Sequence, residues 1–172
     1  MKQSAGSFFL AAALTLPVAA MAADMTVKVS LPQLEVAEYH RPYVALWLEG
    51  ATGPARTLAL WYDVDKKNGE GTKWLKDMRQ WWRKSGRELV MPVDGVSGAT
   101  RPVGEHTLQF SDRKLPLKGL APGQYRLRVE AAREVGGREL LEIPFVWPPV
   151  RAQQLKAQGQ SELATVVLIL TP

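Results

Sequence analysis

The seven-residue stretch that ends at Thr100, Asp-Gly-Val-Ser-Gly-Ala-Thr, combines a hydroxyl nucleophile with small and flexible neighbours. A threonine hydroxyl reacts only when its proton is removed, and no base stands beside Thr100, so a second enzyme and its magnesium ion would have to activate it. Gly98 and Ala99 add little bulk and would let that enzyme close around the backbone. Ser97 and Asp94 can hydrogen-bond nearby backbone groups and hold a turn, and Asp94 can instead contact the second enzyme. The alternative is a glycine-rich turn that only joins two elements.

The sequence lacks other familiar catalytic and metal-binding patterns. His40 and His106 are its two histidines, and neither has a second ligand at zinc-like spacing. The absence of cysteine excludes disulfides, thiolate metal sites, a cysteine nucleophile and attached c-type haem. No Ser-His-Asp order, nucleophile elbow, phosphate-binding loop or dinucleotide fingerprint occurs. We therefore expect no metal site, and we expect that the chain is not itself an enzyme.

Aromatic and basic residues gather just before the Thr100 stretch. Trp74, Trp81 and Trp82 fall on one face of a helical pattern, which is typical of core packing. The alternative is that at least one of the three stacks on the ring of a bound cofactor, and Trp81 and Trp82 are the candidates we select. Residues 63–88 also carry eight lysines and arginines against five acidic residues. These charges indicate either a solvated helix face or a docking patch for an acidic partner or a phosphate.

Short strands are the elements that must position these residues. Alternating apolar and polar residues, with turn-forming residues between the runs, predict two hairpins among about seven strands. The predicted strands are residues 25–31, 43–49, 57–63, 106–110, 124–132, 138–147 and 163–170. A helix is expected at 72–85, with Thr72 as its N-cap and Gly86 as its stop, and a solvated crossover loop at 151–160. The fold class that follows is all-β, an antiparallel immunoglobulin-like β-sandwich with one short inserted amphipathic helix.

Residues 1–23 have the pattern of a cleaved secretory signal peptide. Lys2 supplies the positive start, an apolar run follows, and Ala20-Met21-Ala22 offers the small residues that a signal peptidase needs. The alternative, a membrane anchor, requires about 20 apolar residues, and Pro17 interrupts this shorter run near its end. We therefore expect a periplasmic protein with a single domain over residues 24–172.

The net charge of the mature chain is small. Without Lys2 it has 21 basic and 17 acidic residues, a net charge of +4. Such a charge suits solubility or attraction to an acidic partner. It does not suggest nucleic-acid binding, and an exported protein rarely meets nucleic acid.

The pattern Asp94-x-x-Ser97-Gly98-Ala99-Thr100 resembles the attachment motif of proteins that carry covalent FMN, such as the FMN-binding domains of sodium-pumping NADH:quinone reductase. The resemblance implies that a FAD:protein FMN transferase joins FMN through its phosphate to the hydroxyl of Thr100 and releases AMP. Many carriers have another Ser or Thr two residues after the acceptor, whereas Arg101-Pro102 follows here. Arg101 can pair with the flavin phosphate through its forked donors.

The mature chain also resembles a periplasmic family, the domain of unknown function 2271. Three stretches carry the resemblance: Asn-Gly-Glu-Gly at 68–71, Ser-Gly-Ala-Thr-Arg-Pro at 97–102 and Ala-Arg-Glu-Val-Gly-Gly-Arg-Glu at 132–139. It implies an association with flavin transferases and membrane redox proteins.

The function expected from these observations is periplasmic electron transfer. The chain would carry FMN on Thr100 and pass electrons between a membrane-bound reductase and a periplasmic acceptor. One alternative is an unmodified immunoglobulin-like interaction module that docks a membrane or redox partner. Another is a periplasmic binding protein for a small ligand under the tryptophan helix.

Overall fold

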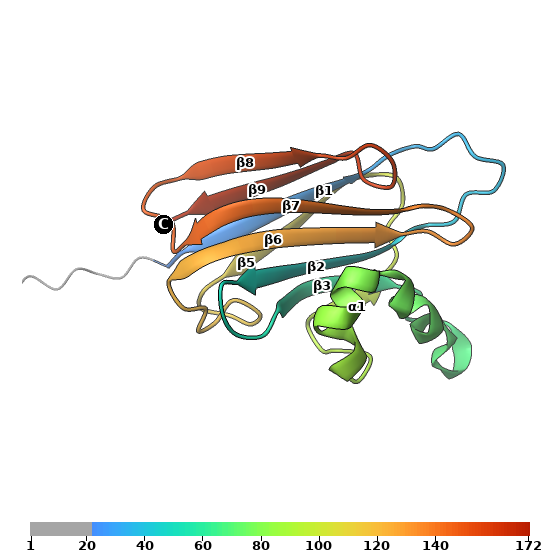
Figure 1. Ribbon diagram of the computed structural model, residues 1–172, viewed down its shortest axis with the longest axis horizontal. Helices are drawn as coiled ribbons and strands as arrows, with labels where there is room; N and C mark the ends of the chain where they lie inside the picture. Colours follow the sequence, from blue (N-terminus) through green and yellow to red (C-terminus); the bar gives the residue numbers. More distant parts are fainter. Residues whose placement is uncertain (1–21) are drawn as a thin grey trace, which may run out of the picture.

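Two β-sheets stack face to face, and a short helical segment lies against one of them (Figure 1). The computed structural model describes residues 22–172, so all but the last two residues of the predicted leader, 1–23, lie outside the described part. The predicted all-β sandwich is confirmed by this arrangement.

The four-stranded sheet has the order β5-β1-β9-β8, and each neighbouring pair is antiparallel. Its strands are β1 (Asp24–Leu31), β5 (Gly104–Ser111), β8 (Gln153–Gln158) and β9 (Thr165–Thr171). The apolar residues that alternate in the sequence of β1 are the ones whose side chains are buried, because successive side chains of a strand point to opposite faces. Met25, Val27 and Val29 are fully buried between the sheets.

The five-stranded sheet has the order β4-β3-β2-β6-β7. Its strands are β2 (Tyr43–Gly50), β3 (Arg56–Tyr62), β4 (Ser97–Ala99), β6 (Gly123–Ala132) and β7 (Arg138–Trp147). The β2–β3 and β6–β7 pairs are the two predicted hairpins, and β2 also pairs antiparallel with β6. The pairing of β4 with β3 is parallel, in contrast to the rest of the sandwich.

Two strands occupy segments that were expected to be loops. The polar segment at 151–160 contains β8, whose Leu155 and Ala157 pack against the core while the residues between them are exposed. The glycine-rich segment before Thr100 contains β4. Both are edge strands, where backbone hydrogen bonds on one side suffice and polar or small side chains are tolerated. The side chains therefore carried little strand signal, and the described residues form more strands than the seven expected.

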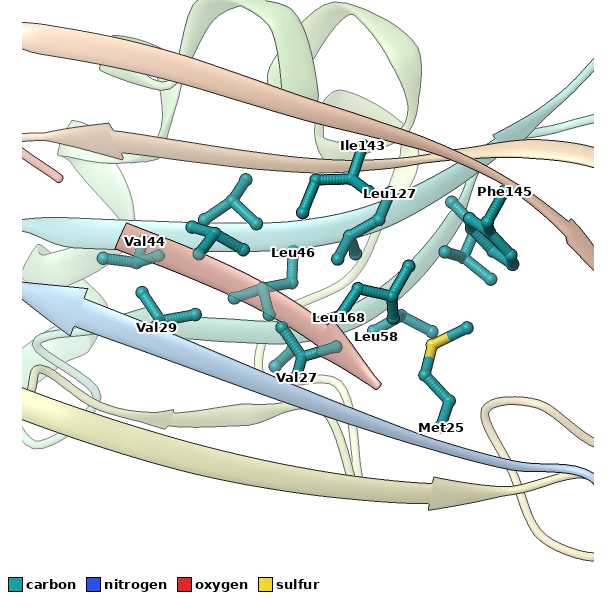
Figure 2. Packing of buried hydrophobic residues seen from close by; sticks show 14 of the residues in the cluster. Met25, Val27, Val29, Val44, Leu46, Leu58, Leu127, Ile143, Phe145 and Leu168 are labelled. Atoms are coloured by element: carbon teal, nitrogen blue, oxygen red, sulfur yellow. The ribbon is translucent and has the colours of Figure 1, made fainter. Parts of the chain in front are cut away.

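The main core lies between the two sheets. Figure 2 shows Val27 and Val29 of β1 facing Val44 and Leu46 of β2, with Leu127 nearby. Burial of each such side chain stabilises the fold by roughly 1.5–3 kcal/mol. The sandwich therefore has an apolar interior along its whole length.

A second apolar cluster covers the outer face of the five-stranded sheet. Tyr43, Trp47 and Tyr62 of the sheet pack there against Leu75, Met78 and Trp81 of the helical segment. The helical segment is thus held to the sheet by a core of its own.

The helical segment is not the single helix that the sequence predicts for 72–85. It consists of 3-10 turns η1 (Lys67–Asp77), a six-residue helix α1 (Arg79–Lys84) and a last turn η2 (Gly86–Glu88). Thr72 does not cap a helix, because its hydroxyl donates to the carbonyl of Gly69. Gly86 is needed for close packing, since a Cβ there would lie 2.7 Å from the ring of Trp81.

Candidate functional site

Thr100 follows directly after the edge strand β4. The turn before β4 is held by Ser97, whose hydroxyl oxygen accepts from Val93 N at 2.9 Å and whose N–H donates to Val93 O at 2.9 Å. Asp94 is exposed in this turn. The carboxylate of Asp94 is therefore open to solvent or to a partner.

Gly98 and Ala99 leave the backbone before Thr100 open. A Cβ at position 98 would lie 3.9 Å from Trp61 Cδ1, an ordinary contact, so the fold itself does not require glycine there. Ala99 is exposed. The small residues of this strand thus give access to Thr100 from outside the sandwich.

Half-buried Thr100 lines a cavity of about 580 Å³ at the end of the sandwich where the β6–β7 hairpin turns (Figure 1). Its other walls are the end of the connection from β1 to β2, the connection that follows β3, the junction of η1 with α1, and the hairpin turn itself. Besides Thr100, the lining side chains include Tyr39, Arg41, Tyr43, Lys66, Trp74, Arg79, Arg133, Val135 and Arg138. This volume is within the usual range for small-molecule sites, about 300–1,000 Å³.

The register of the five-stranded sheet explains how distant segments meet at this cavity. Ala99 lies opposite Tyr62 of β3, and Tyr43 of β2 lies opposite Ala132 of β6, which pairs with Arg138 of β7. The rings of Tyr43 and Tyr62 are neighbours, with centroids 6.2 Å apart. One row of residues therefore crosses the sheet from the end of β4 to Arg138, about 19 Å at four strand spacings.

Two arginines of the hairpin are each held by a buried carboxylate. Arg133 Nε and Nη2 donate to Glu162 Oε2 and Oε1 at 2.9 and 3.1 Å, and Arg138 Nη1 donates to Glu130 Oε1 at 2.8 Å. Glu130 and Glu162 are 0% and 3% exposed, and among the described residues they are the buried charged ones. Removing a carboxylate from water costs several kcal/mol unless it is paired. Each pair therefore fixes one arginine at the cavity.

The hairpin turn itself is tight and strained. Gly137 N donates to Glu162 Oε1 at 2.8 Å, and a Cβ at position 137 would lie 2.7 Å from that oxygen, so a larger residue would displace the carboxylate. Val135 has a φ of +52° and is 86% exposed. A β-branched residue in the left-handed region is strained, and such strain is common at ligand sites. Val135 thus keeps an apolar side chain at the cavity rim despite this strain.

Glu130 also connects the cavity to the helical segment. Its carboxylate accepts from Gln80 N at 3.0 Å and from Trp81 N at 2.8 Å, at the start of α1. No side chain of the helix caps this end. One buried carboxylate from the sheet therefore holds both Arg138 and the backbone that follows Arg79.

The aromatic side chains of the cavity are neutral. Burial raises the pKa of Tyr39 and, more strongly, that of Tyr43, so both phenols stay protonated at neutral pH. The hydroxyl of Tyr43 donates to Gly71 O at 3.1 Å, which ties this wall to the helical segment. Trp74 lines the cavity and is 44% exposed. Its ring is therefore accessible to a ligand.

The remaining charges of the cavity are partly paired. Lys66 Nζ lies 3.0 Å from Asp63, whose hydrogen bond and charge raise the pKa of Lys66. His40 lies between the carboxylates of Glu38 and Glu134, at 3.1 and 3.8 Å. For Arg41 and Arg79 no ion pair is found within residues 22–172. Both guanidinium groups remain available to an anion.

A family model described as "Predicted periplasmic protein (DUF2271)" matches residues 24–165. The chain belongs to this family. The DUF2271 protein is periplasmic, in agreement with the localisation expected from its N-terminal sequence. No curated protein matches the chain.

A solved structure, human GIVD cytosolic phospholipase A2 in complex with methyl gamma-linolenyl fluorophosphonate, matches with a TM-score of 0.33 and 12% identity. The match covers 87% of this chain and 17% of that chain, so the DUF2271 protein spans about a sixth of the phospholipase. A likeness of this degree carries no functional argument.

The three stretches that resemble the DUF2271 family converge on the cavity. Thr100 comes from the second stretch, and the hairpin arginines come from the third. The first contributes Gly71, whose carbonyl accepts the hydrogen bond from Tyr43 of the cavity wall. Stretches that are far apart in the sequence therefore build one site.

The structure places Arg101 and two of the tryptophans away from the cavity lining. Arg101 lies over the ring of Trp61, with Cζ 5.6 Å from the ring centroid. Trp81 is fully buried and its Nε1 donates to Thr57 Oγ1 at 3.0 Å, so it has no open ring face. Half-buried Trp82 packs beside it. The cavity is instead lined by Trp74, by Arg79 of the basic region at 63–88, and by Arg41, Arg133 and Arg138, to which the sequence patterns assigned no role.

Residues 22–172 contain no group of three His, Cys, Asp or Glu side chains that could hold a metal ion. In the same range no helix is long and apolar enough to cross a membrane.

Proposed function

We propose that the DUF2271 protein carries FMN covalently, in phosphoester linkage to Thr100, and takes part in electron transfer in the periplasm. The observation that carries this proposal is the position of Thr100. Thr100 follows directly after the edge strand β4 and also lines a cavity of aromatic and basic side chains. The hydroxyl can thus be reached by a second enzyme, and the attached group has a place to lie.

The chemistry of the cavity suits a flavin. The exposed ring of Trp74 and the half-buried, neutral phenol of Tyr39 offer aromatic surface for stacking, and the buried Tyr43 forms part of the wall. Five basic and three acidic side chains line the cavity, and Arg41 and Arg79 are outside the ion pairs of the described residues. A phosphate joined to Thr100 is a diester with one negative charge, which these guanidinium groups would stabilise.

The attachment step transfers FMN from FAD. The Oγ of Thr100 forms a bond to the FMN phosphorus, the bond between the two phosphates of FAD breaks, and AMP leaves. The hydroxyl proton passes to a base of the transferase, and its magnesium ion stabilises the charge on the phosphates. Once bound, a flavin supplies reversible electron transfer. The part of this chain is to present Thr100 and to surround the ring.

The cavity also favours a second candidate, a periplasmic binding protein for a small ligand. Its volume and exposed Trp74 would serve such a function without any covalent step. The mass of the denatured protein distinguishes the two candidates, because only a covalent carrier keeps the added FMN group.

Co-expression with a periplasmic FAD:protein FMN transferase tests the proposal. We expect a yellow protein whose intact mass is increased by one FMN group. Thr100→Ala should abolish the increase, whereas Thr107→Ala, at an exposed threonine of β5, should retain it. An unchanged mass with an active transferase, or covalent flavin on the Thr100→Ala variant, would refute the proposal.

A further inference from the structure

We propose that Arg138 raises the reduction potential of the flavin on Thr100 by contacting its ring at the hairpin end of the cavity. This inference rests on the proposed function. It assigns the binding of the flavin ring to the part of the cavity formed by the β6–β7 hairpin, at the opposite edge of the sheet from Thr100. It is carried by the sheet register, the fixed position of Arg138 and the apolar rim beside it.

The register sets the direction in which the carried group extends. Its phosphate is tied to Thr100, at the β4 edge of the residue row, and Arg138 stands at the β7 edge, about 19 Å away across four strand spacings. A phosphate, a sugar-alcohol chain and a three-ring system in line span a comparable length. The cavity joins both ends, so the ring would lie near the hairpin and not near Thr100.

Arg138 is prepared to meet a ligand. Its Nη1 donates to buried Glu130 at 2.8 Å, which fixes the orientation of the guanidinium plane. Nε and Nη2 have no hydrogen-bond partner within residues 22–172, and the side chain is 36% exposed. An arginine that is held on one side and open on the other can donate to a ring carbonyl at little entropic cost.

Two exposed apolar side chains line the same cavity. Val135 is strained at the tip of the hairpin, three residues before Arg138, and Trp74 comes from the helical segment. A planar ring would cover both and explain why an 86% exposed valine is kept in an unfavourable conformation. The hairpin end therefore offers apolar contacts for a ring and a cation for its polar edge.

The sign of the effect follows from the charges. Reduction adds two electrons and one proton to the ring, so a neutral oxidised ring becomes an anion. A fixed cation at its polar edge stabilises the anion more than the neutral form and raises the potential. Glu130 offsets part of this effect, but it lies behind Arg138 and is farther from the cavity.

The test is a spectroelectrochemical titration of the flavin-loaded protein with redox mediators at pH 7. Loading is first confirmed by intact mass. We expect Arg138→Gln to lower the midpoint potential and Arg138→Lys to restore most of it. Arg126→Gln, at an exposed arginine near the other end of β6, should leave the potential unchanged.

A second variant controls for the charge of Glu130, because Arg138→Gln leaves this buried carboxylate without its cationic partner. Arg138→Gln combined with Glu130→Gln removes both charges and should lower the potential by a smaller amount than the single change. An unchanged potential in fully loaded Arg138→Gln or in the double variant would overturn the inference and leave the proposed function intact. An equal shift in Arg126→Gln would overturn it as well. Failure of the unaltered protein to load would instead refute the proposed function, and the inference with it.

Discussion

Replacing Glu130 by glutamine measures how strongly one buried carboxylate holds the site together. Its Oε1 accepts from Gln80 N and Arg138 Nη1, and its Oε2 accepts from Gln80 N and Trp81 N. A glutamine keeps one acceptor oxygen and turns the other into an NH2 group that would face an N–H donor. At least one hydrogen bond is therefore lost, and the others no longer have an anionic acceptor.

The expected loss of stability is about 3 kcal/mol. Glu130 has three donors, because the N–H of Gln80 is shared between its two oxygens. A hydrogen bond to a charged group contributes about 1.5–3 kcal/mol and a neutral one about 1 kcal/mol, so the loss of one bond and the weakening of the other two give about this value. It lies at the lower end of the range of about 3–5 kcal/mol for breaking a buried ion pair, because the partly exposed guanidinium of Arg138 can be hydrated. For a chain of this size, the melting temperature should fall by about 10 °C.

Urea unfolding at pH 7, followed by tryptophan fluorescence, measures this loss directly. The matched control is Glu142→Gln on β7, since Glu142 pairs with Arg128 at 3.2 Å and its side chain is 51% exposed. A surface pair contributes at most about 1 kcal/mol, so the control should change stability little. If Glu130→Gln were no more destabilising than Glu142→Gln, the assignment of Glu130 as the link between hairpin and helix would be wrong.

Three further predictions concern stability and the cavity. Burial alone would raise the pKa of Glu139, but hydrogen bonds from the backbone of the β8–β9 connection lower it below 4.5. The ionised carboxylate therefore stabilises the fold at pH 7, and Glu139→Gln should be less stable there than the unaltered protein. In urea unfolding at several pH values, this difference in unfolding free energy should disappear as the pH falls below 4.5. Gly137→Ala should cost about 1–3 kcal/mol in the same assay because its Cβ meets a carboxylate oxygen, whereas Gly98→Ala should unfold like the unaltered protein. In the loaded protein, Trp74→Leu should raise flavin fluorescence and Trp82→Leu should not, since Trp74 lines the cavity; the reverse pattern would place the ring elsewhere.

The strands show how much the sequence can predict when local pattern and environment agree. Apolar alternation predicted the buried face of β1, and it predicted both the pairing and the buried faces of the β6–β7 hairpin, because a strand with one buried face must alternate. The edge strands β4 and β8 had no such pattern, since their backbone pairs on one side and their side chains are polar or small. The predicted helix at 72–85 is broken at Met78, whose φ of −77° and ψ of 73° are not helical, and the carboxylate of Glu130 accepts from the first N–H groups of the new helix α1.

Local order along the chain was enough to predict seven of the strands of the described residues, the sandwich class and the stretch that ends at Thr100. Only the tertiary structure decided which charges are buried, that Trp74 and not Trp81 lines the cavity, and that the hairpin arginines share this cavity with Thr100. The physical reason is distance along the chain. Trp81 and Glu130 are 49 residues apart and Arg133 and Glu162 are 29 apart, so these contacts depend on strand register and sheet order, which no local pattern of residues encodes.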